Sequence, residues 1–286
     1  MTLRASVLSV IIPSYKDPLL CKTIQSVLDN AVGDVEVIPV LDGYETDDIP
    51  SDPRVFIVKS PTNLGMRGAI NAGLAIAEGE FVMKLDSHCL LAPDFDKELT
   101  ESCAKNWLMI PRRYSLEDTL WQRNEGRPIR DYHYFEYPAE NGCGLFVHAW
   151  GKKGGTEIDD TMAFQGSCWL ANRRYFMEHV GMLDDRLETY GTFIGDQAEI
   201  GLKYWLNDGE IKVNKRTWYA HLQKTKRHYI SKMYSKSYKT NRLSPKQWAY
   251  TARHWMNNEE PGMKKPLSWL IEKFSPVPSW PENWGK

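Results

Sequence analysis

Strand-like apolar runs alternate with helical patterns along the first hundred residues of the chain. Residues 7–13 form a β-branched apolar run of the kind found in buried parallel strands, and Pro18 opens a segment of helical periodicity. Strands joined by short helical connections form right-handed parallel crossovers. The sequence therefore predicts an α/β protein with a Rossmann-like, mostly parallel sheet flanked by helices. Further strands are expected at 35–41, 55–58 and 80–85, and further helices at 63–78 and 95–106.

The second half of the chain is less regular. Residues 107–161 are rich in Arg, Tyr, Gly and Pro and are expected to form a less regular excursion over the active face. The tail, residues 264–286, contains three Trp and several Pro and is expected to wrap the surface as ordered coil. Between these segments, apolar patterns predict strands at 163–170 and 210–218 and helices at 172–180 and 195–206.

Composition limits the class of protein. Of the 286 residues, 42% are hydrophobic and 26% are charged, which is typical of a globular protein and argues against a disordered or collagenous chain. No apolar run approaches the roughly 18 residues of a membrane span, so we expect no transmembrane segment and a cytoplasmic location. The five Cys are an odd number without a CxxC pair, which argues against a disulfide framework or a zinc ribbon.

Polar residues follow several of the expected strands. Asp42 ends the second strand, and Asp86 and His88 come directly after the fourth. On extended backbone, side chains at positions i and i+2 point the same way, and a carboxylate with an imidazole suits Mn²⁺ or a similar ion. Open α/β sheets bind ligands at this edge. An Asp at a strand end is also a common turn former, so the pattern alone leaves both interpretations open.

Six short motifs over about residues 7–225 resemble those of the family-2 glycosyltransferases of the GT-A fold, and they occur in the same order as in that family. In addition, KLDSHC at 84–89 is similar to the DxH element of the polypeptide N-acetylgalactosaminyltransferases. The resemblance implies a GT-A fold and a glycosyltransferase that uses a nucleotide-sugar donor, taken to be UDP-linked. The six motifs are SVIIPSY at 9–15, VLDG at 40–43, NLGMRGAINAG at 63–73, TMAFQG at 161–166, GDQAE at 195–199 and WYAH at 218–221.

The resemblance also implies roles for individual residues. Asp86, His88 and His221 would hold Mn²⁺ or Mg²⁺, with His221 as the third ligand after the last strand. A solvated helix face remains the alternative for Arg67. The chain departs from the peptide transferases at Gln165, where a small residue is expected. The residues expected to bind the nucleotide sugar are Pro13, Tyr15, Asp42, Arg67, Asp86, Lys224 and Arg227.

Asp196 and Glu199 are the expected catalytic carboxylates. They are three residues apart near the start of a helix, so they can share one face of it. An inverting enzyme needs one carboxylate as general base for the acceptor hydroxyl, whereas a retaining enzyme can use it only to orient groups. The motifs do not decide between the two outcomes, and helix capping by Asp196 is the simpler alternative.

The expected domain organisation follows from the extent of the resemblance. Residues 1–225 would form the GT-A catalytic domain, with a nucleotide-sugar-binding half at 1–106 and an acceptor-side half at 107–225. Residues 226–286 would be a basic aromatic extension packed on the same domain.

Charge is distributed unevenly along the chain. Residues 211–258 contain 12 of the 36 Lys and Arg, eight aromatic residues and no Asp or Glu. Cations interleaved with aromatic rings suit phosphates and stacked bases, which suggests a nucleic-acid acceptor such as a hydroxymethylated base in phage-type DNA. Such a viral enzyme would act in the host cytoplasm. A lid over the donor diphosphate and contact with a membrane surface or another acidic acceptor are the alternatives.

Other classes of function are also open. Polysaccharide, lipid-linked and protein acceptors fit a family-2 enzyme equally well. A nucleotidyltransferase would use a similar sheet, but residues 13–17 lack a Gly-rich phosphate loop. A non-catalytic nucleotide-sugar-binding module is the third class, against which the presence of Asp86, His88 and Asp196 argues.

Overall fold

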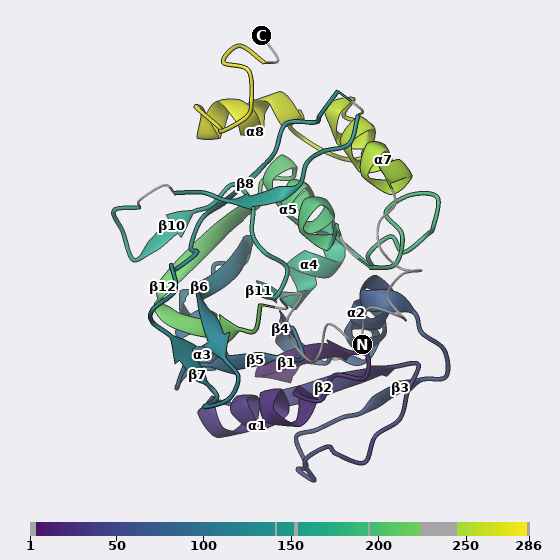
Figure 1. The fold of residues 1–286 in the computed structure, drawn as a ribbon, viewed down its shortest axis with the longest axis vertical. Helices are drawn as coiled ribbons and strands as arrows, with labels where there is room; N and C mark the ends of the chain where they lie inside the picture. The colour runs from purple at the N-terminus through teal and green to yellow at the C-terminus, as the bar shows by residue number, and fades with distance from the viewer. Residues whose placement is uncertain (1–3, 141, 152–153, 194, 224–244, 285–286) are drawn as a thin grey trace.

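The computed structural model describes residues 4–140, 142–151, 154–193, 195–223 and 245–284. A ten-stranded mixed sheet runs through this part of the molecule in the order β10-β12-β6-β11-β4-β1-β2-β3, with β5 paired to β12 and β7 paired to β6 (Figure 1). The first strands are β1 (Arg4–Ser14), β2 (Val35–Asp42), β3 (Val58–Ser60) and β4 (Gly79–Leu85), and they are parallel.

Alternate side chains of β1 pack on opposite faces of the sheet, as the period of a strand requires. Val10 and Ile12 belong to the hydrophobic cluster that contains α1 (Leu20–Asn30) and α3 (Phe95–Ser102). Ile11 belongs to the other cluster, which contains α2 (Gly65–Ile76), α4 (Arg173–His179) and α5 (Asp196–Leu206). Two layers of helices therefore cover the sheet, as predicted.

The second half of the sheet is built differently. β6 (Trp107–Glu117) lies parallel to β12 (Glu210–His221), and β11 (Cys168–Asn172) lies antiparallel between β4 and β6. Residues 107–161 are more regular at their start than expected, because β6 is an 11-residue strand. The small strands are β5 (Cys89–Leu91), β7 (Gln122–Asn124), β8 (His133–Phe135), β9 (Val147–Ala149) and β10 (Ile158–Asp160).

Two other predicted strands are shifted along the chain. Val55 makes only an isolated bridge with Val37, and β3 begins three residues later than predicted. The strand predicted at 163–170 begins at Cys168, because the preceding residues form the loop that reaches the candidate site.

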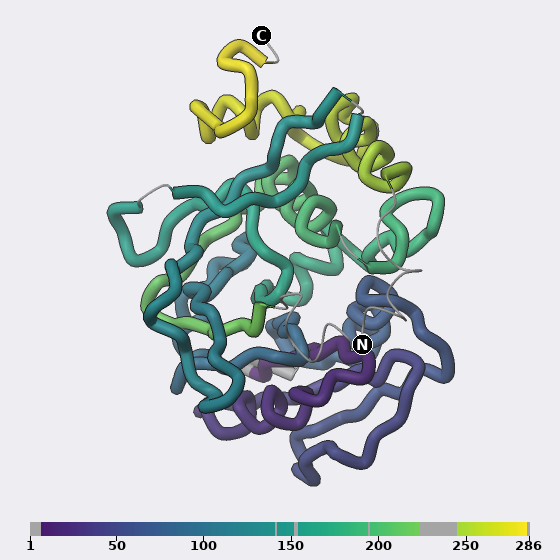
Figure 2. The backbone as a smooth tube through the Cα atoms, viewed as in Figure 1, coloured from purple at the N-terminus to yellow at the C-terminus, as the bar shows by residue number. Residues whose placement is uncertain are grey.

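The C-terminal residues complete the molecule at the end opposite the N-terminal strands (Figure 2). The tail is not all coil, because α8 (Leu267–Phe274) follows α7 (Pro245–Met256). Residues of both helices join the larger hydrophobic cluster. The proposed boundary at 225/226 stays a prediction, since residues 224–244 lie outside the described residues. Among the described residues, no helix is both long enough and apolar enough to cross a membrane.

Candidate functional site

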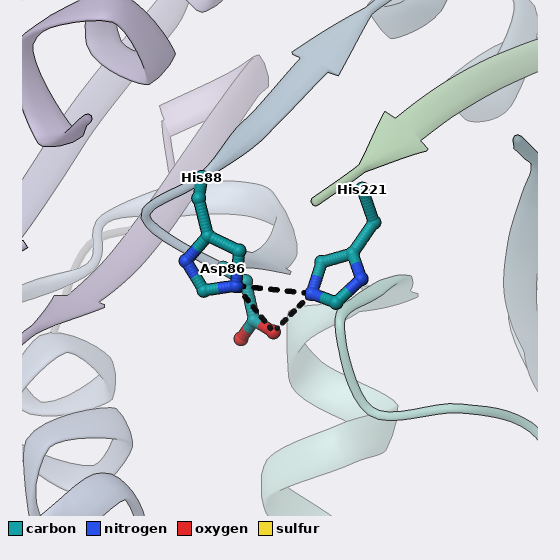
Figure 3. Close-up of side chains that lie close together, drawn as sticks. All are labelled: Asp86, His88 and His221. Carbon is teal, nitrogen blue, oxygen red and sulfur yellow. Dashed lines mark hydrogen bonds and ion pairs between the residues drawn. The ribbon is translucent and has the colours of Figure 1, made fainter. Parts of the chain in front are cut away.

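Asp86, His88 and His221 converge at the carboxyl edge of the sheet (Figure 3). Nε2 of His221 lies 3.1 Å from both Nε2 of His88 and Oδ2 of Asp86, and His88 Nε2 lies 3.9 Å from the same oxygen. The spacing of Asp86 and His88 predicted extended backbone. Instead, the two residues lie in the turn between β4 and β5. That turn brings His88 toward His221 at the end of β12, where Cys89 and His221 pair across the sheet.

A carboxylate missed by the sequence analysis orients this cluster. Oδ2 of Asp17 lies 2.8 Å from Nδ1 of His88 and accepts a hydrogen bond of 2.8 Å from the Ser87 hydroxyl. The Asp17 side chain is buried, and its Oδ1 accepts from the backbone N–H of Leu19. An N–H at Nδ1 of His88 that donates to Asp17 leaves the lone pair of Nε2 facing the other two members of the cluster.

His221 is held from its other side by Arg113, whose Nη2 lies 3.2 Å from Nδ1 of His221. Burial lowers the pKa of His221 to about 3, so the imidazole is neutral near pH 7. Burial alone would raise the pKa of Asp86, but Lys84 and His221 outweigh it and hold that pKa well below the usual range. The cluster therefore presents one ionised carboxylate and one neutral imidazole, both in forms that bind divalent cations.

Lys84 connects this cluster with Asp196. Its buried ammonium donates to Asp86 and to the carbonyl oxygen of Gly166. Asp196 lies against the same glycine, because a Cβ at Gly166 would come within 2.5 Å of Oδ2 of Asp196. Only a residue without a side chain fits there, so Gly166 sets the distance between the loop and the first turn of α5.

Asp196 occupies a buried position at the start of α5. Its side chain is buried, and Oδ2 has no hydrogen-bond partner among the described residues. Burial raises the pKa of Asp196, against the opposing effect of Lys84 and Arg67. The capping alternative has no support, because the N-cap residue is Gly195 and Asp196 is the first residue of α5. A buried carboxylate oxygen without a partner is costly, which marks it as a candidate functional group.

Glu199 and Arg67 form a buried ion pair instead of facing the cluster. The Arg67 side chain is 0% exposed and donates to Glu199 and to the carbonyl oxygen of Asp184. Glu199 also accepts a 2.8 Å hydrogen bond from Lys203. The alternative of a solvated helix face for Arg67 is therefore wrong. Its expected contact with the donor diphosphate, and a catalytic role for Glu199, remain predictions without support from this geometry.

The other expected donor ligands lie at the same edge of the sheet. Asp42 is buried, and its two carboxylate oxygens accept hydrogen bonds from the backbone N–H groups of Leu64 and Gly65 at the start of α2. Burial raises the pKa of Asp42, although these two bonds oppose it. Pro13 and Tyr15 are half-buried at the end of β1, and Tyr15 packs edge-to-face on Tyr44. Lys224 and Arg227 lie outside the described residues.

Cations in the described part of residues 211–258 are largely paired with acids from other elements. Lys212 pairs with Asp160, and Lys215 lies 2.6 Å from Asp159. The positive charge of this segment is therefore partly neutralised once the chain is folded. The remaining pairs are Lys212 with Glu210, Arg216 with Glu98 and Arg253 with Glu259.

Comparisons with known proteins agree with the fold. An N-acetylgalactosaminyltransferase 4 of Drosophila melanogaster is 28% identical over 222 residues, which cover 73% of this chain and 31% of the fly protein. An uncharacterized glycosyltransferase of Haemophilus influenzae is 31% identical over 121 residues, which cover 39% of this chain and 48% of that protein. The chain thus spans less than half the length of these curated relatives.

A crystal structure of GalNAc-T7 with UDP, GalNAc and Mn²⁺ has the same fold. It matches with a TM-score of 0.68 and 16% identity, over 94% of this chain and 57% of that chain. The likeness confirms the predicted GT-A fold. The sequence model of glycosyl transferase family 2 matches residues 9–180, which is more than half of the chain. This protein therefore belongs to glycosyl transferase family 2.

Proposed function

We propose that the protein is a metal-dependent glycosyltransferase that moves a sugar from a UDP-linked donor to an acceptor hydroxyl. The observation that carries the proposal is the convergence of Asp86, His88 and His221 at the carboxyl edge of the sheet. The GalNAc-T7 structure supports the choice of UDP and Mn²⁺, since it contains both.

The residues present fit a divalent ion. Their facing N and O atoms are 3.1 to 3.9 Å apart, and ligands at about 2.1 Å from a shared ion are separated by similar distances. Two imidazoles and one carboxylate form a mixed N/O donor set that suits Mn²⁺ better than Ca²⁺. Bound there, the ion would neutralise the charge that develops on the diphosphate leaving group.

The protein's own residues would do the rest. Asp17 fixes the ring of His88, and Lys84 fixes the carboxylate of Asp86. In the transfer, the acceptor oxygen bonds to the anomeric carbon, the bond from that carbon to the diphosphate oxygen breaks, and UDP leaves with the electron pair. In an inverting reaction Asp196 takes the hydroxyl proton. In a retaining reaction the proton passes to the departing diphosphate oxygen, and Asp196 orients the acceptor.

The identity of the acceptor and the cellular location are predicted from the sequence alone. A hydroxymethylated base in DNA, and an enzyme acting in the cytoplasm, remain the interpretations that the sequence suggests. The described structure adds no support for DNA, because Lys212 and Lys215 are neutralised by neighbouring acids. Lys232, Lys236 and Lys239, which would carry much of the contact with phosphate, lie outside the described residues.

Metal-dependent release of UDP tests the proposal. Wild-type protein is incubated with a panel of UDP-sugars, with Mn²⁺ or with EDTA, and free UDP is measured. We expect turnover only with the ion, and loss of turnover in Asp86→Ala and His88→Ala with nearly unchanged melting temperatures. Full turnover in EDTA would show the metal assignment to be wrong. Transfer of a nucleotidyl group, with release of pyrophosphate, would instead support the nucleotidyltransferase alternative.

A further inference from the structure

A pocket of about 260 Å³ opens beside the first turn of α5. We propose that this pocket holds the acceptor and that the acceptor is a sugar ring, so the enzyme extends a carbohydrate. The proposal rests on the function proposed above. The residues that matter for it are Arg130, Phe146, Gln165, Gln197 and Trp248, which all line the pocket.

The position of the pocket suits an acceptor. Gly195, Gln197 and Ala198 line it, whereas Asp196 between them turns toward Gly166 and Lys84. Gln165, next to Gly166, also lines the pocket. Asp196 therefore stands between the pocket and the cluster of Asp86, His88 and His221. A sugar held between Gln165 and Gln197 would place a hydroxyl next to the residue proposed as base.

The lining has the chemistry of a sugar site. Phe146 and Trp248 have ring centroids 4.2 Å apart and together form an aromatic wall. The C–H face of a pyranose carries partial positive charge and packs on the negative face of an aromatic ring. Oε1 of Gln165 is buried without a hydrogen-bond partner, so it would accept from a hydroxyl of the ring. Gln197 supplies a second amide.

Size and charge favour a sugar over larger or polyanionic acceptors. The volume lies just below the range of about 300 to 1,000 Å³ for pockets of drug-sized ligands, so one ring fits and a folded peptide segment does not. Arg130 is the only Lys or Arg among the described residues that line the pocket. A nucleic acid needs a track of cations for its phosphates, and the described cations nearby in the sequence are mostly paired with acids.

Binding is tested first, without turnover. Saturation-transfer NMR is recorded on the full chain with methyl glycosides of glucose, galactose, N-acetylglucosamine, N-acetylgalactosamine and glucuronic acid. We expect at least one glycoside to receive saturation and to lose it in Trp248→Ala. Trp269→Ala is the matched control, because Trp269 is a half-buried Trp on α8 outside the pocket. A glycoside that binds both variants equally would overturn the proposal.

Transfer is measured next with the glycoside that binds. In Trp248→Ala the acceptor KM should rise about tenfold, the size of a lost aromatic contact, and Trp248→Phe should restore much of it. Gln165→Ala should raise the acceptor KM about fivefold. These ratios are compared with Trp269→Ala, which should match the wild type. An unchanged acceptor KM in Trp248→Ala and Gln165→Ala, both folded by their melting curves, would show that the acceptor binds elsewhere.

The two proposals fail in different ways. Absence of UDP release from wild-type protein with every donor would refute the proposed function. UDP release with Mn²⁺, but with no glycoside bound or modified, would refute the sugar pocket alone. In that second case, labelling of an oligonucleotide that contains 5-hydroxymethyl pyrimidines would identify nucleic acid as the acceptor instead.

Discussion

Asp17 lies behind His88 and fixes the orientation of its ring. Oδ2 of Asp17 lies 2.8 Å from Nδ1 of His88, and the carboxylate is anchored by Ser87 and the backbone of Leu19. Carboxylates in this position keep a ligating imidazole in the tautomer that binds metal. Asp17 therefore belongs to the site although it would not touch the ion.

Asp17→Asn should weaken binding of Mn²⁺ about 10- to 100-fold, because the amide holds the ring less firmly and can also present its N–H to Nδ1. Affinity is measured by titration of the Mn²⁺ electron paramagnetic resonance signal, which does not depend on turnover. Asp34→Asn serves as control, since Asp34 is exposed before β2 at the other edge of the sheet. An equal affinity in the two variants would leave Asp17 with a purely structural role.

Asp196→Asn should reduce transfer by roughly 100-fold or more if the reaction inverts, since a general base contributes about 10²- to 10⁴-fold. Donor affinity should change little. Because burial raises the pKa of Asp196, the acid limb of kcat/KM should lie above the pH expected for an ordinary Asp. NMR of the product anomer decides the class, and a retained configuration would remove the role as base.

The same substitution should stabilise the protein at neutral pH. A carboxyl whose pKa is raised on folding binds its proton more tightly in the folded state, so it destabilises the fold above its folded pKa. The destabilisation disappears as the pH falls below the pKa of the unfolded chain. Urea unfolding at pH 7 and at pH 3 should therefore show the advantage of Asp196→Asn at pH 7 only.

The three residues predicted at strand ends lie together in the structure, and their role as metal ligands stays a prediction. Asp86 was predicted from its position at the carboxyl edge of the sheet. The family motifs then indicated His88 and His221. Asp17 was missed because its partner, His88, is 71 positions away in the sequence. The local sequence pattern does not indicate a contact over that separation. It also follows the first strand, so the rule applied to Asp42 could have found it.

At the scale of elements, a buried ion pair joins α2 to α5. Arg67 on α2 binds Glu199 on α5, and its guanidinium lies over the ring of Tyr190 at 4.8 Å. The helix that carries Asp196 is thereby fixed against α2. This contact explains why Arg67 is buried although the helical pattern alone permitted an exposed face.

Arg67→Met should cost about 3 to 5 kcal/mol of unfolding free energy, because it leaves Glu199 buried without its main partner. Adding Glu199→Gln should restore part of the loss, since no uncompensated charge then remains. Both are measured by urea unfolding with EDTA present. If Arg67→Met unfolds like wild type but raises the donor KM, the predicted contact with the diphosphate is correct and the structural role is secondary.

Elements were predicted well where local pattern and tertiary environment agree. β1, β2 and β4 lie inside the sheet and are rich in apolar residues, which is typical of buried parallel strands. β6 was missed because Pro111, Arg112 and Arg113 interrupt its apolar run. These residues are tolerated in a strand only because β12 and Asp131 supply their partners, which the local sequence does not reveal.

At the scale of the whole molecule, the C-terminal helices close the hydrophobic core. Phe274 of α8 packs edge-to-face on Trp205 of α5 at 5.2 Å, and Trp255 of α7 donates to the hydroxyl of Tyr190. Trp280, further on, donates to the carbonyl oxygen of Phe135. Residues 245–284 thus contact both α5 and β8, as expected for an extension that belongs to the same domain.

One cooperative unfolding transition should therefore include the C-terminal helices. Leu270 is fully buried on α8, and Leu270→Ala should cost about 2 to 5 kcal/mol, the usual range for a leucine removed from a core. Because α8 packs on α5, the whole calorimetric transition should move to lower temperature without splitting. Ser268→Ala, at a half-buried position on the same helix, is the control and should leave the transition within about 0.5 kcal/mol. A second, separate transition that alone responds to Leu270→Ala would mean that residues 245–284 unfold independently, and the catalytic domain would then end near residue 225 as a unit of its own.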